Sequence, residues 1–497
     1  MKATIAKWYA AQVVKRMKRD DARAIECQMQ TMRALLQRAS STQFGKDHQF
    51  GALREYDEMR QAIPIRDYES LYPYIQRVVD GERDVLWPGL PTYFCKTSGT
   101  TSGTKYIPLT RESMPNHIGS ARNALLAYIH ETKRAEFVQG KMIFLQGSPK
   151  LDRLPSGIPY GRLSGIVANH VPSYLQRNRM PSYATNCMED WEEKVHAIAR
   201  ETMHERMSLI SGIPNWVQMY FEVLLATSGA SDIRSLFPDF NLFVFGGVNF
   251  EPYRERFRQL IGADIPSIEL YPASEGFIAY QDSQQEEGLR LNVNDGIFFE
   301  FIPVDTYFDE NPTRISLADV KLGVNYALIL HTNAGLWGYS IGDTIRFVSL
   351  NPYRIKVTGR IKHFTSAFGE HVIAEEVELA MQRALQEFPC VINEFHVAPQ
   401  VTPTDGLPYH EWFVEASDLP ADVNAFAQVI DEVMQEKNIY YRDLIKGRVL
   451  QSARIKFVRV GAFNEYMKSI GKLGGQNKVP RLSNDRNIAD QLAKWSR

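Results

Sequence analysis

Strand-length apolar runs recur between stretches of helical periodicity from about residue 90 to residue 355, and this alternation restricts the possible folds more than any other feature. The runs are KMIFLQG (141–147), NLFVFGG (241–247), SIELYPASEG (267–276), GIFFEFIPV (296–304) and NYALILHT (325–332). Each is short enough for a buried strand, and helices between consecutive strands are typical of an α/β sheet. The sequence therefore predicts an α/β domain.

The two ends of the chain differ from this middle part. Residues 1 to about 90 predict helices joined by turn-rich connections, and the residues after about 360 predict a compact series of helices and strands. A chain of 497 residues is too long for one ordinary core. We therefore expect a large N-terminal α/β domain of β-sheets and packed helices, residues 1–357, and a small α+β C-terminal domain, residues 358–497.

Composition restricts the class of partner. The chain carries 57 basic and 58 acidic residues, a formal net charge of −1, so it lacks the positive field that would attract nucleic acid. Its four cysteines form no CxxC pair, which argues against a zinc site or a disulfide framework. No apolar run approaches the roughly 18 residues of a membrane span. We expect a cytoplasmic protein with a small-molecule partner, and a monomer as the default state.

The N-terminal segment MKATIAKWYAAQVVKRMKRDDA interrupts every apolar group with basic residues, unlike a signal peptide. Its large apolar residues recur at helical spacing: Ile5, Trp8, Tyr9, Val13 and Met17. We expect a packed amphipathic helix with a solvated basic face, and a helix on a membrane surface is the alternative.

A run of Gly, Ser and Thr, residues 97–104, precedes Lys105 in the segment CKTSGTTSGTKYIPLT. Its glycine and lysine spacing does not match the Walker pattern GxxxxGK[ST]. Glycines still allow backbone N–H groups to converge on an anion, while the hydroxyls add donors and the lysine adds a charge. Because strand-like residues flank the run on both sides, we favour a phosphate-binding loop over a flexible linker.

Two further motifs lie at strand ends, where open α/β sheets bind ligands. In YPASEG, Tyr271 could stack on a purine, Ser274 could donate to a phosphate and Glu275 could hold Mg²⁺, which prefers oxygen ligands. In GLWGYSIGDTIRF, Asp343 could accept two ribose hydroxyls, although an Asp-containing turn explains the same residues. Taken singly, each motif is a weak indication.

Two Gly-rich basic segments complete the series, GRIKHFTSAFGEHVIAEEVE (359–378) and GKLGGQNKVPRL (471–482). The order of all five motifs resembles the acyl-adenylate-forming superfamily of firefly luciferase and the acyl-CoA synthetases. The stretch from TQFGKDHQF through CKTSGTTSGTKYIPLT is similar to the auxin-responsive acyl-acid amido synthetases of plants and their bacterial relatives. The resemblance spans about residues 42–482 and is most specific over 64–110 and 335–378.

This resemblance implies a reaction in two steps. ATP and a carboxylic acid would give an acyl-adenylate and pyrophosphate, and an amine, usually that of an amino acid, would attack the activated carbonyl to form an amide and release AMP. ATP and Mg²⁺ are then the expected cofactors. The alternatives are an acyl-CoA ligase and a nucleotide-binding regulatory protein without turnover, and a kinase-like phosphotransferase is weakened by the failed Walker spacing.

The resemblance also assigns nucleotide contacts by position. The phosphates would be held by Ser98, Gly99, Thr100, Thr101, Ser102 and Lys105. Gly246 and Gly247 would flank the adenine, with Tyr271 against its face. Ser274 would touch the α-phosphate and Glu275 the Mg²⁺. Asp343, assisted by Arg360, would bind the ribose.

Two lysines would act through the small domain. Lys362 matches the hinge about which that domain swings in the superfamily. Lys478 matches the mobile lysine that reaches the α-phosphate and the carboxylate, where its charge would offset developing negative charge. We therefore expect Lys478, Glu275 and Lys105 to be catalytic. The acid itself is not identified, although the helix near 114–130 should form one wall of its pocket, where Arg122 could meet a carboxylate or lie at the surface.

Overall fold

The computed structural model describes residues 2–98, 104–170, 177–188, 190–247, 250, 253–361, 370, 372–446, 449–473 and 478–497. The chain divides into a larger unit, residues 1–248 with 264–356, and a smaller unit, residues 249–263 with 357–497. The segment 249–263 belongs to the smaller unit, whereas the sequence predicted a single boundary near residue 357 and placed this segment in the larger domain. The prediction of a large α/β part and a small α+β part is confirmed.

Up to residue 79 the regular elements of the larger unit are helices, and after that helices alternate with strands. The helices are α1 (Lys2–Asp21), α2 (Ala24–Ala39), α3 (Gln43–Asp47), α4 (Tyr56–Ala62), α5 (Tyr68–Val79), α6 (Met114–Thr132), α7 (Leu163–Ala168), α9 (Tyr183–Asn186), α10 (Trp191–Thr202), α11 (Pro214–Ser228) and α12 (Ile233–Leu236). None of the helices in the described ranges combines the length and the apolarity that crossing a bilayer requires.

The strands of the larger unit form two sheets. They are β1 (Tyr93–Ser98), β2 (Thr104–Leu109), β3 (Lys141–Phe144), β4 (Asp152–Arg153), β5 (Pro159–Gly161), β6 (Arg179–Met180), β7 (Met207–Ser211), β8 (Leu242–Gly246), β9 (Ser267–Ala273), β10 (Gly276–Tyr280), β11 (Leu289–Leu291), β12 (Ile297–Pro303), β13 (Asn325–Thr332), β14 (Tyr339–Leu350) and β15 (Tyr353–Arg360). All five apolar runs of the sequence contain a strand, as predicted.

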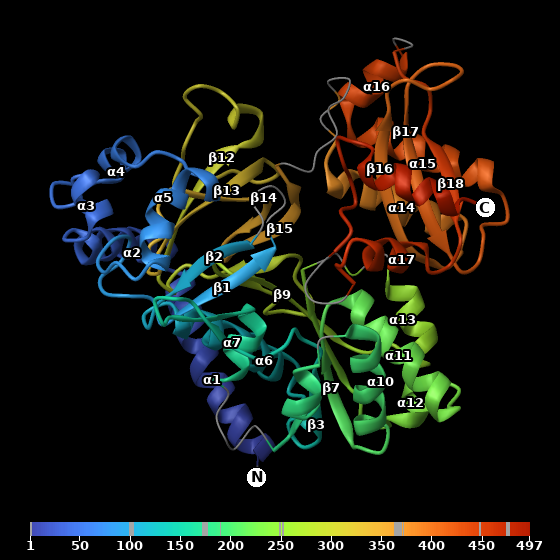
Figure 1. Cartoon of the computed structure of the whole chain (residues 1–497), viewed down its shortest axis with the longest axis horizontal. Helices are drawn as coiled ribbons and strands as arrows, with labels where there is room; N and C mark the ends of the chain where they lie inside the picture. The colour runs from blue at the N-terminus through green and yellow to red at the C-terminus, as the bar shows by residue number, and fades with distance from the viewer. Residues whose placement is uncertain are drawn as a thin grey trace. The chain divides into compact units, whose positions relative to one another are not determined.

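The large sheet has 11 strands in the order β12-β13-β14-β15-β11-β10-β9-β8-β7-β3-β6. Strands β6, β3, β7, β8 and β9 run parallel to one another. Antiparallel pairs occur at β9–β10, β10–β11, β11–β15, β12–β13 and β13–β14. Helix α6 packs on β9 and β10, and α10 and α11 pack together beside β7 (Figure 1). The parallel part therefore has its carboxyl ends at one edge, where ligands bind in such sheets.

The predicted N-terminal helix is α1, but only part of its apolar surface is packed. The residues packed in the core beside α6 recur at i, i+3, i+4 and i+7: Ala10, Val13, Val14 and Met17. The prediction was wrong for Ile5, Trp8 and Tyr9, which are 59%, 66% and 39% exposed. At 100° per residue, the packed stripe turns Trp8 to the opposite side of the helix, into solvent.

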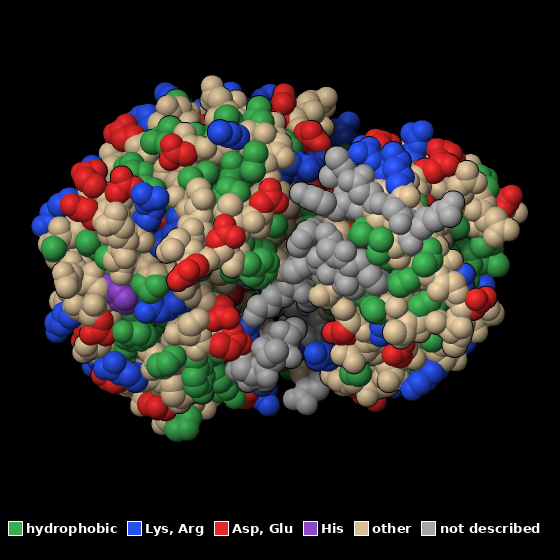
Figure 2. All heavy atoms as spheres, turned by 90° about the horizontal axis from the view of Figure 1, so that it is seen from above, with side chains coloured by type: hydrophobic (Ala, Val, Ile, Leu, Met, Phe, Trp, Pro, Cys, Tyr) green, Lys and Arg blue, Asp and Glu red, His purple; other side chains and the backbone are tan. Residues whose placement is uncertain are grey.

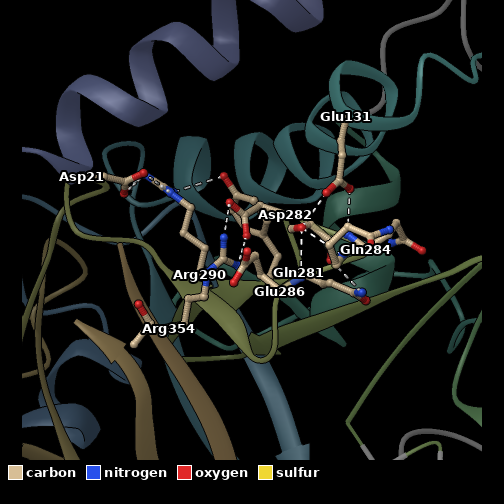
Figure 3. Close-up of polar contacts among 12 residues, drawn as sticks. Asp21, Glu131, Gln281, Asp282, Gln284, Glu286, Arg290 and Arg354 are labelled. Carbon is tan, nitrogen blue, oxygen red and sulfur yellow. Dashed lines mark hydrogen bonds and ion pairs between the residues drawn. The ribbon is translucent and has the colours of Figure 1, made fainter. Parts of the chain in front are cut away.

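Charged and polar bonds fix the end of α1 to β11 and the end of α6 to the connection before β11 (Figure 3). Arg290 of β11 is 4% exposed and lies 2.7 Å from a carboxylate oxygen of Asp21, at the end of α1. Glu131, in the last turn of α6, accepts the backbone N–H of Gln284 at 2.7 Å. Elsewhere, Figure 2 shows acidic and basic side chains intermixed over the visible face, in agreement with the near-zero net charge.

The smaller unit is built on a three-stranded sheet. Its elements are α13 (Arg254–Ile261), α14 (Ala374–Glu387), β16 (Ile392–Gln400), β17 (Tyr409–Ala416), α15 (Val423–Lys437), α16 (Ile439–Lys446), β18 (Arg454–Val458), α17 (Ala462–Ser469) and α18 (Asn487–Leu492). β17 is buried along its whole length between β16 and β18. Trp412 and Val414 pack with α14 and α15, and Phe413 packs with α17 and α18, so helices cover both faces.

Glu376, in the first turn of α14, should make the stability of the smaller unit depend on pH. Both hydrogen bonds to its carboxyl, from the Ile373 backbone N–H and the Asn438 amide, reach Oε2 at 3.1 Å. Burial raises its pKa from 4.5 to about 7. The folded state therefore binds more protons than the unfolded state in this interval, so the free energy of unfolding should fall as the pH rises through it.

We expect the free energy of unfolding to fall by about 1–3 kcal/mol between roughly pH 4.5 and 7.5. Urea unfolding at a series of pH values measures it. Glu376→Gln should remove most of this dependence. Glu432→Gln, which changes an exposed carboxyl on α15, is the matched control. An identical pH profile for Glu376→Gln and the wild type would contradict the assignment.

Candidate active site

The Ser/Thr/Gly run connects the two strands of a β-hairpin. β1 and β2 pair antiparallel, with Ser98 opposite Thr104, so the connection is residues 99–103. Four predicted phosphate ligands lie outside the described residues, Gly99, Thr100, Thr101 and Ser102, as does the side chain of Ser98. Their role stays a prediction. Both flanking segments are strands, which was the reason for favouring a loop over a linker.

Lys105 follows this loop and is held by the start of α5. Its Nζ lies 3.5 Å from a carboxylate oxygen of Glu69 and 4.9 Å from the centre of the Tyr68 ring. The Tyr68 hydroxyl accepts the Tyr106 backbone N–H at 2.9 Å. Asp67 caps α5 by accepting the Ser70 backbone N–H, which fixes where the helix begins. The ammonium group is thus oriented at the root of the hairpin, with the side chain 21% exposed.

Gly246 and Gly247 end β8, and the backbone explains both residues. Gly246 pairs with Leu270, and a Cβ at Gly246 would lie 2.5 Å from the Leu270 carbonyl oxygen. Gly247 has a φ of +84°, which glycine adopts without strain. Gly246 therefore lets β8 approach β9 closely, and Gly247 lets the chain turn away at the carboxyl end of β8. Their contact with adenine stays a prediction.

Tyr271 and Asp343 meet although their strands are not neighbours. The Tyr271 hydroxyl donates to Asp343 Oδ2 at 2.6 Å, and the Tyr271 side chain is 7% exposed. Three strands, β10, β11 and β15, separate β9 from β14 in the sheet. In a flat sheet, four inter-strand spacings would place β9 and β14 about 19 Å apart. The antiparallel half must therefore curl around its apolar core, and the curl brings two predicted nucleotide residues together.

Ser274 and Glu275 lie in the turn between β9 and β10, beside β1. Burial raises the pKa of the Cys95 thiol in β1, the Ser274 hydrogen bond opposes this rise and the charge of Glu275 adds to it. Burial and then the Glu275 charge also raise the pKa of Tyr339, at the start of β14, well above its usual value. Glu275 thus lies near both the hairpin sheet and the strand that carries Asp343.

A buried charge cluster supports the turn before Asp343. Glu300 of β12 is fully buried and lies 2.5 Å from Arg314 and 2.6 Å from His331 Nε2. His331 Nδ1 lies 3.2 Å from the Gly338 backbone nitrogen, which donates to it, so the imidazole proton is on Nε2. Burial alone would raise the pKa of Glu300, but the His331 hydrogen bond and the Arg314 charge hold it below its usual value.

Sequence reasoning missed this cluster because its members come from separate segments. Glu300 and His331 lie diagonally across the β12–β13 pair, since Phe298 is opposite His331. Gly338 has a φ of +57°, and a Cβ there would lie 2.4 Å from the Pro64 carbonyl oxygen. A single His in an apolar strand gives no such signal. Only the strand register connects it to the segment that leads to Asp343.

The remaining predicted residues belong to the smaller unit. Arg360, at the end of β15, and Lys478, on the C-terminal segment, are both exposed. Lys362, the predicted hinge, lies outside the described residues.

Arg481, three residues after Lys478, anchors the C-terminal segment. It forms an ion pair with Glu394 and donates to the Tyr253 hydroxyl at 3.0 Å. The Val397 backbone N–H donates to the Arg481 carbonyl oxygen at 2.9 Å, so the segment adds to the edge of β16. The motif K-x-x-R therefore combines an exposed lysine with a fixed arginine, a positioning role that sequence reasoning did not assign.

The described residues suit Mg²⁺ better than a metal enclosed by protein. Among them, no three or more His, Cys, Asp or Glu side chains gather with metal-ligand geometry. Mg²⁺ commonly takes one or two carboxylates and completes its shell with phosphate oxygens and water. Glu275, half-buried at a strand end, fits such a site.

The helix expected near 114–130 is α6, and Arg122 on it faces α1. Arg122 lines a cavity of about 440 Å³ together with Arg16, Arg19 and Asp295. Its guanidinium lies 5.8 Å from the centre of the Tyr9 ring. A contact between Arg122 and the acid stays a prediction.

Comparison with known families gives matches along most of the chain. The GH3 family N-terminal domain matches residues 13–182 and 162–266, the GH3 family central domain matches 291–360, and the GH3 family C-terminal domain matches 375–487. The three domains follow one another in this order.

Individual proteins agree with these matches. A jasmonoyl–L-amino acid synthetase of Oryza sativa subsp. japonica is 22% identical over an alignment of 562 positions, gaps included, which covers 93% of this chain and 93% of that protein. An acyl acid amido synthetase solved in complex with 2,4-DB has a TM-score of 0.80 at 17% identity, over 98% of this chain and 96% of that one. A 2-hydroxyisobutyryl-CoA ligase in the postadenylation state has a TM-score of 0.61 at 12% identity, over 95% and 91%. At these identities the two structures establish the shared fold.

Proposed function

The chain belongs to the GH3 family, and from this premise we propose that it is an ATP-dependent ligase that activates a carboxylic acid as an acyl-adenylate and conjugates it to an amine. An amino acid is the expected acceptor, and an amide and AMP are the products. The observation that carries the proposal is the alignment of 93% of the chain with a jasmonoyl–L-amino acid synthetase. The meeting of Tyr271 with Asp343 at the sheet edge supports it.

Five side chains have distinct roles in this proposal. Asp343, oriented by the Tyr271 hydroxyl, would accept the ribose hydroxyls, and Lys105 would pair with phosphate oxygens. Mg²⁺ held through Glu275 would supply positive charge to the phosphates. Lys478 would offset the charge that develops between carboxylate and α-phosphate as pyrophosphate leaves. A cytoplasmic location and a monomeric state stay expectations from the sequence.

The alternatives share parts of this chemistry. An acyl-CoA ligase would form the same adenylate and differ only in its acceptor, and a regulatory protein would bind the nucleotide without turnover. Acceptor identity and turnover therefore separate the three possibilities.

We expect the purified protein, with ATP, Mg²⁺ and a panel of carboxylic acids, to catalyse acid-dependent exchange of pyrophosphate into ATP. Addition of amino acids should then release AMP and an amide, identified by product mass. Replacing the amino acid by coenzyme A tests for a thioester, and reactions without acid are the control. Release of ADP, or nucleotide binding without exchange for any acid, would contradict the proposal.

A further inference from the structure

A buried lysine lies at the carboxyl end of β3, and no step of the proposed reaction uses it. Lys194 of α10 is 3% exposed. Its ammonium group donates to two backbone carbonyl oxygens, Gln146 at 3.1 Å and Asn186 at 2.7 Å. Gln146 is the second residue after β3, so the charge is placed at the edge where the parallel strands end.

Two arginines accompany this lysine. The Arg179 guanidinium, from β6, lies 5.4 Å from the centre of the Phe144 ring and donates to the Ala168 carbonyl oxygen at 3.1 Å. Arg162 lies against Gly147, where a Cβ would come within 2.4 Å of Arg162 Cδ. Three cations therefore contact the segment 144–147. We call them the β3 cation cluster: Arg162, Arg179 and Lys194.

The β3 cation cluster has no carboxylate partner among the described residues. Burial lowers the pKa of all three side chains, that of Lys194 to about 8, where Cys187 opposes the lowering and the Arg162 charge adds to it. Lys194 and Arg179 donate to backbone carbonyls, whereas Arg162 has no acceptor in the described part of the chain. Lys194 is buried, and Arg162 and Arg179 are half-buried. Holding three cations in such surroundings without a counter-charge costs free energy, and an anionic ligand would offset that cost.

The cluster lies on the same edge as the predicted nucleotide site. β3, β7, β8 and β9 run parallel, so their carboxyl ends share this edge. β3 lies three positions from β9, which is about 14 Å along a sheet. A ligand whose activated carboxyl is beside Ser274, after β9, therefore needs an extended body to reach Arg162.

We propose that Arg162, supported by Lys194 and Arg179, binds a second carboxylate at the far end of the acyl substrate. The inference rests on the proposed function and specifies that the acid substrate of that reaction is a dicarboxylic acid. An α-amino acid acceptor fits less well, because one carbon joins its amine to its carboxylate and the amine must reach the activated carbonyl. A guanidinium forms two parallel hydrogen bonds with a carboxylate, whereas an alkyl end would leave it unpaired.

The test compares dicarboxylic acids of increasing length with the monocarboxylic acids of the same length in pyrophosphate exchange, which needs no acceptor. We expect the best dicarboxylic acid to exceed its matched monoacid in kcat/KM by about tenfold or more. Arg162→Met should lower this ratio by about 10- to 100-fold. Arg162→Lys, which keeps the charge without the paired geometry, should lower it less. Arg153→Met, which removes a nearby exposed arginine, should leave the ratio unchanged.

Each other outcome overturns the assignment. A wild type that prefers the monoacid, or a ratio unchanged in both Arg162 variants, excludes a dicarboxylic acid. If the ratio is unchanged while Arg162→Met erases a preference for an amino acid over its carboxamide, the cluster binds the acceptor carboxylate instead. Failure of the proposed function is distinguishable, since in that case none of the acids would support pyrophosphate exchange by the wild type. Circular dichroism of each variant verifies folding.

Discussion

Replacing Glu300 by glutamine is expected to lower the free energy of unfolding by about 3–5 kcal/mol. The fully buried carboxylate balances Arg314, whose side chain is only 8% exposed, and accepts the proton of His331. Glutamine keeps the shape but removes the charge, so the guanidinium would remain buried without a counter-ion. Urea unfolding followed by circular dichroism measures the change.

The matched control is Glu55→Gln. Glu55 pairs with Arg33 at 3.3 Å, but both side chains are more than half exposed, so water screens the pair. We expect its removal to cost less than about 1 kcal/mol. An equally small loss in Glu300→Gln would show that the buried cluster does not stabilise the turn before Asp343.

Glu275→Gln is expected to lower the rate of acid-dependent pyrophosphate exchange by about 10²- to 10³-fold, the usual effect of removing one preorganised electrostatic group. An amide oxygen is a poorer Mg²⁺ ligand than a carboxylate, so the variant should also require more Mg²⁺ for half-maximal exchange. Exchange rates measured over a Mg²⁺ titration test both effects.

Two variants complete this experiment. Glu275→Asp retains the carboxylate and should recover part of the rate. Glu287→Gln removes an exposed carboxylate that pairs with Lys356 on the same unit and should behave as the wild type. If Glu275→Gln keeps more than about a tenth of the wild-type rate, a role for Glu275 in binding Mg²⁺ is excluded.

The sequence predicted elements well where the signal is local. Apolar periodicity located the five strand runs and the helices and strands of the smaller unit, because buried faces repeat at 3.6 or 2 residues. The ordered motifs predicted the family, which the matches confirm. Periodicity does not reveal which neighbour covers a face. It therefore could not show that α6 packs on Val13 of α1 and leaves Trp8 exposed.

The sequence allowed the residues of the site to be predicted, but not the contacts between them. Tyr271 and Asp343 were both assigned to the nucleotide, yet their 2.6 Å hydrogen bond depends on the curl of the sheet. Glu300, His331 and Arg314 were missed because ion pairs between distant segments leave no local pattern. The β3 cation cluster was missed for the same reason, since α10, β6 and the start of α7 each contribute one member.

The assignment of residues 249–263 to the smaller unit affects how the protein can be divided and how it is synthesised. The chain passes between the units three times, after residues 248, 263 and 356. A protease cut near residue 357 would therefore leave the smaller unit without α13 and without Tyr253, to which Arg481 donates. During translation, α13 is synthesised before residues 264–356, whereas the rest of the smaller unit is synthesised after them, so α13 with its buried Phe257 and Leu260 is made long before most of its own unit.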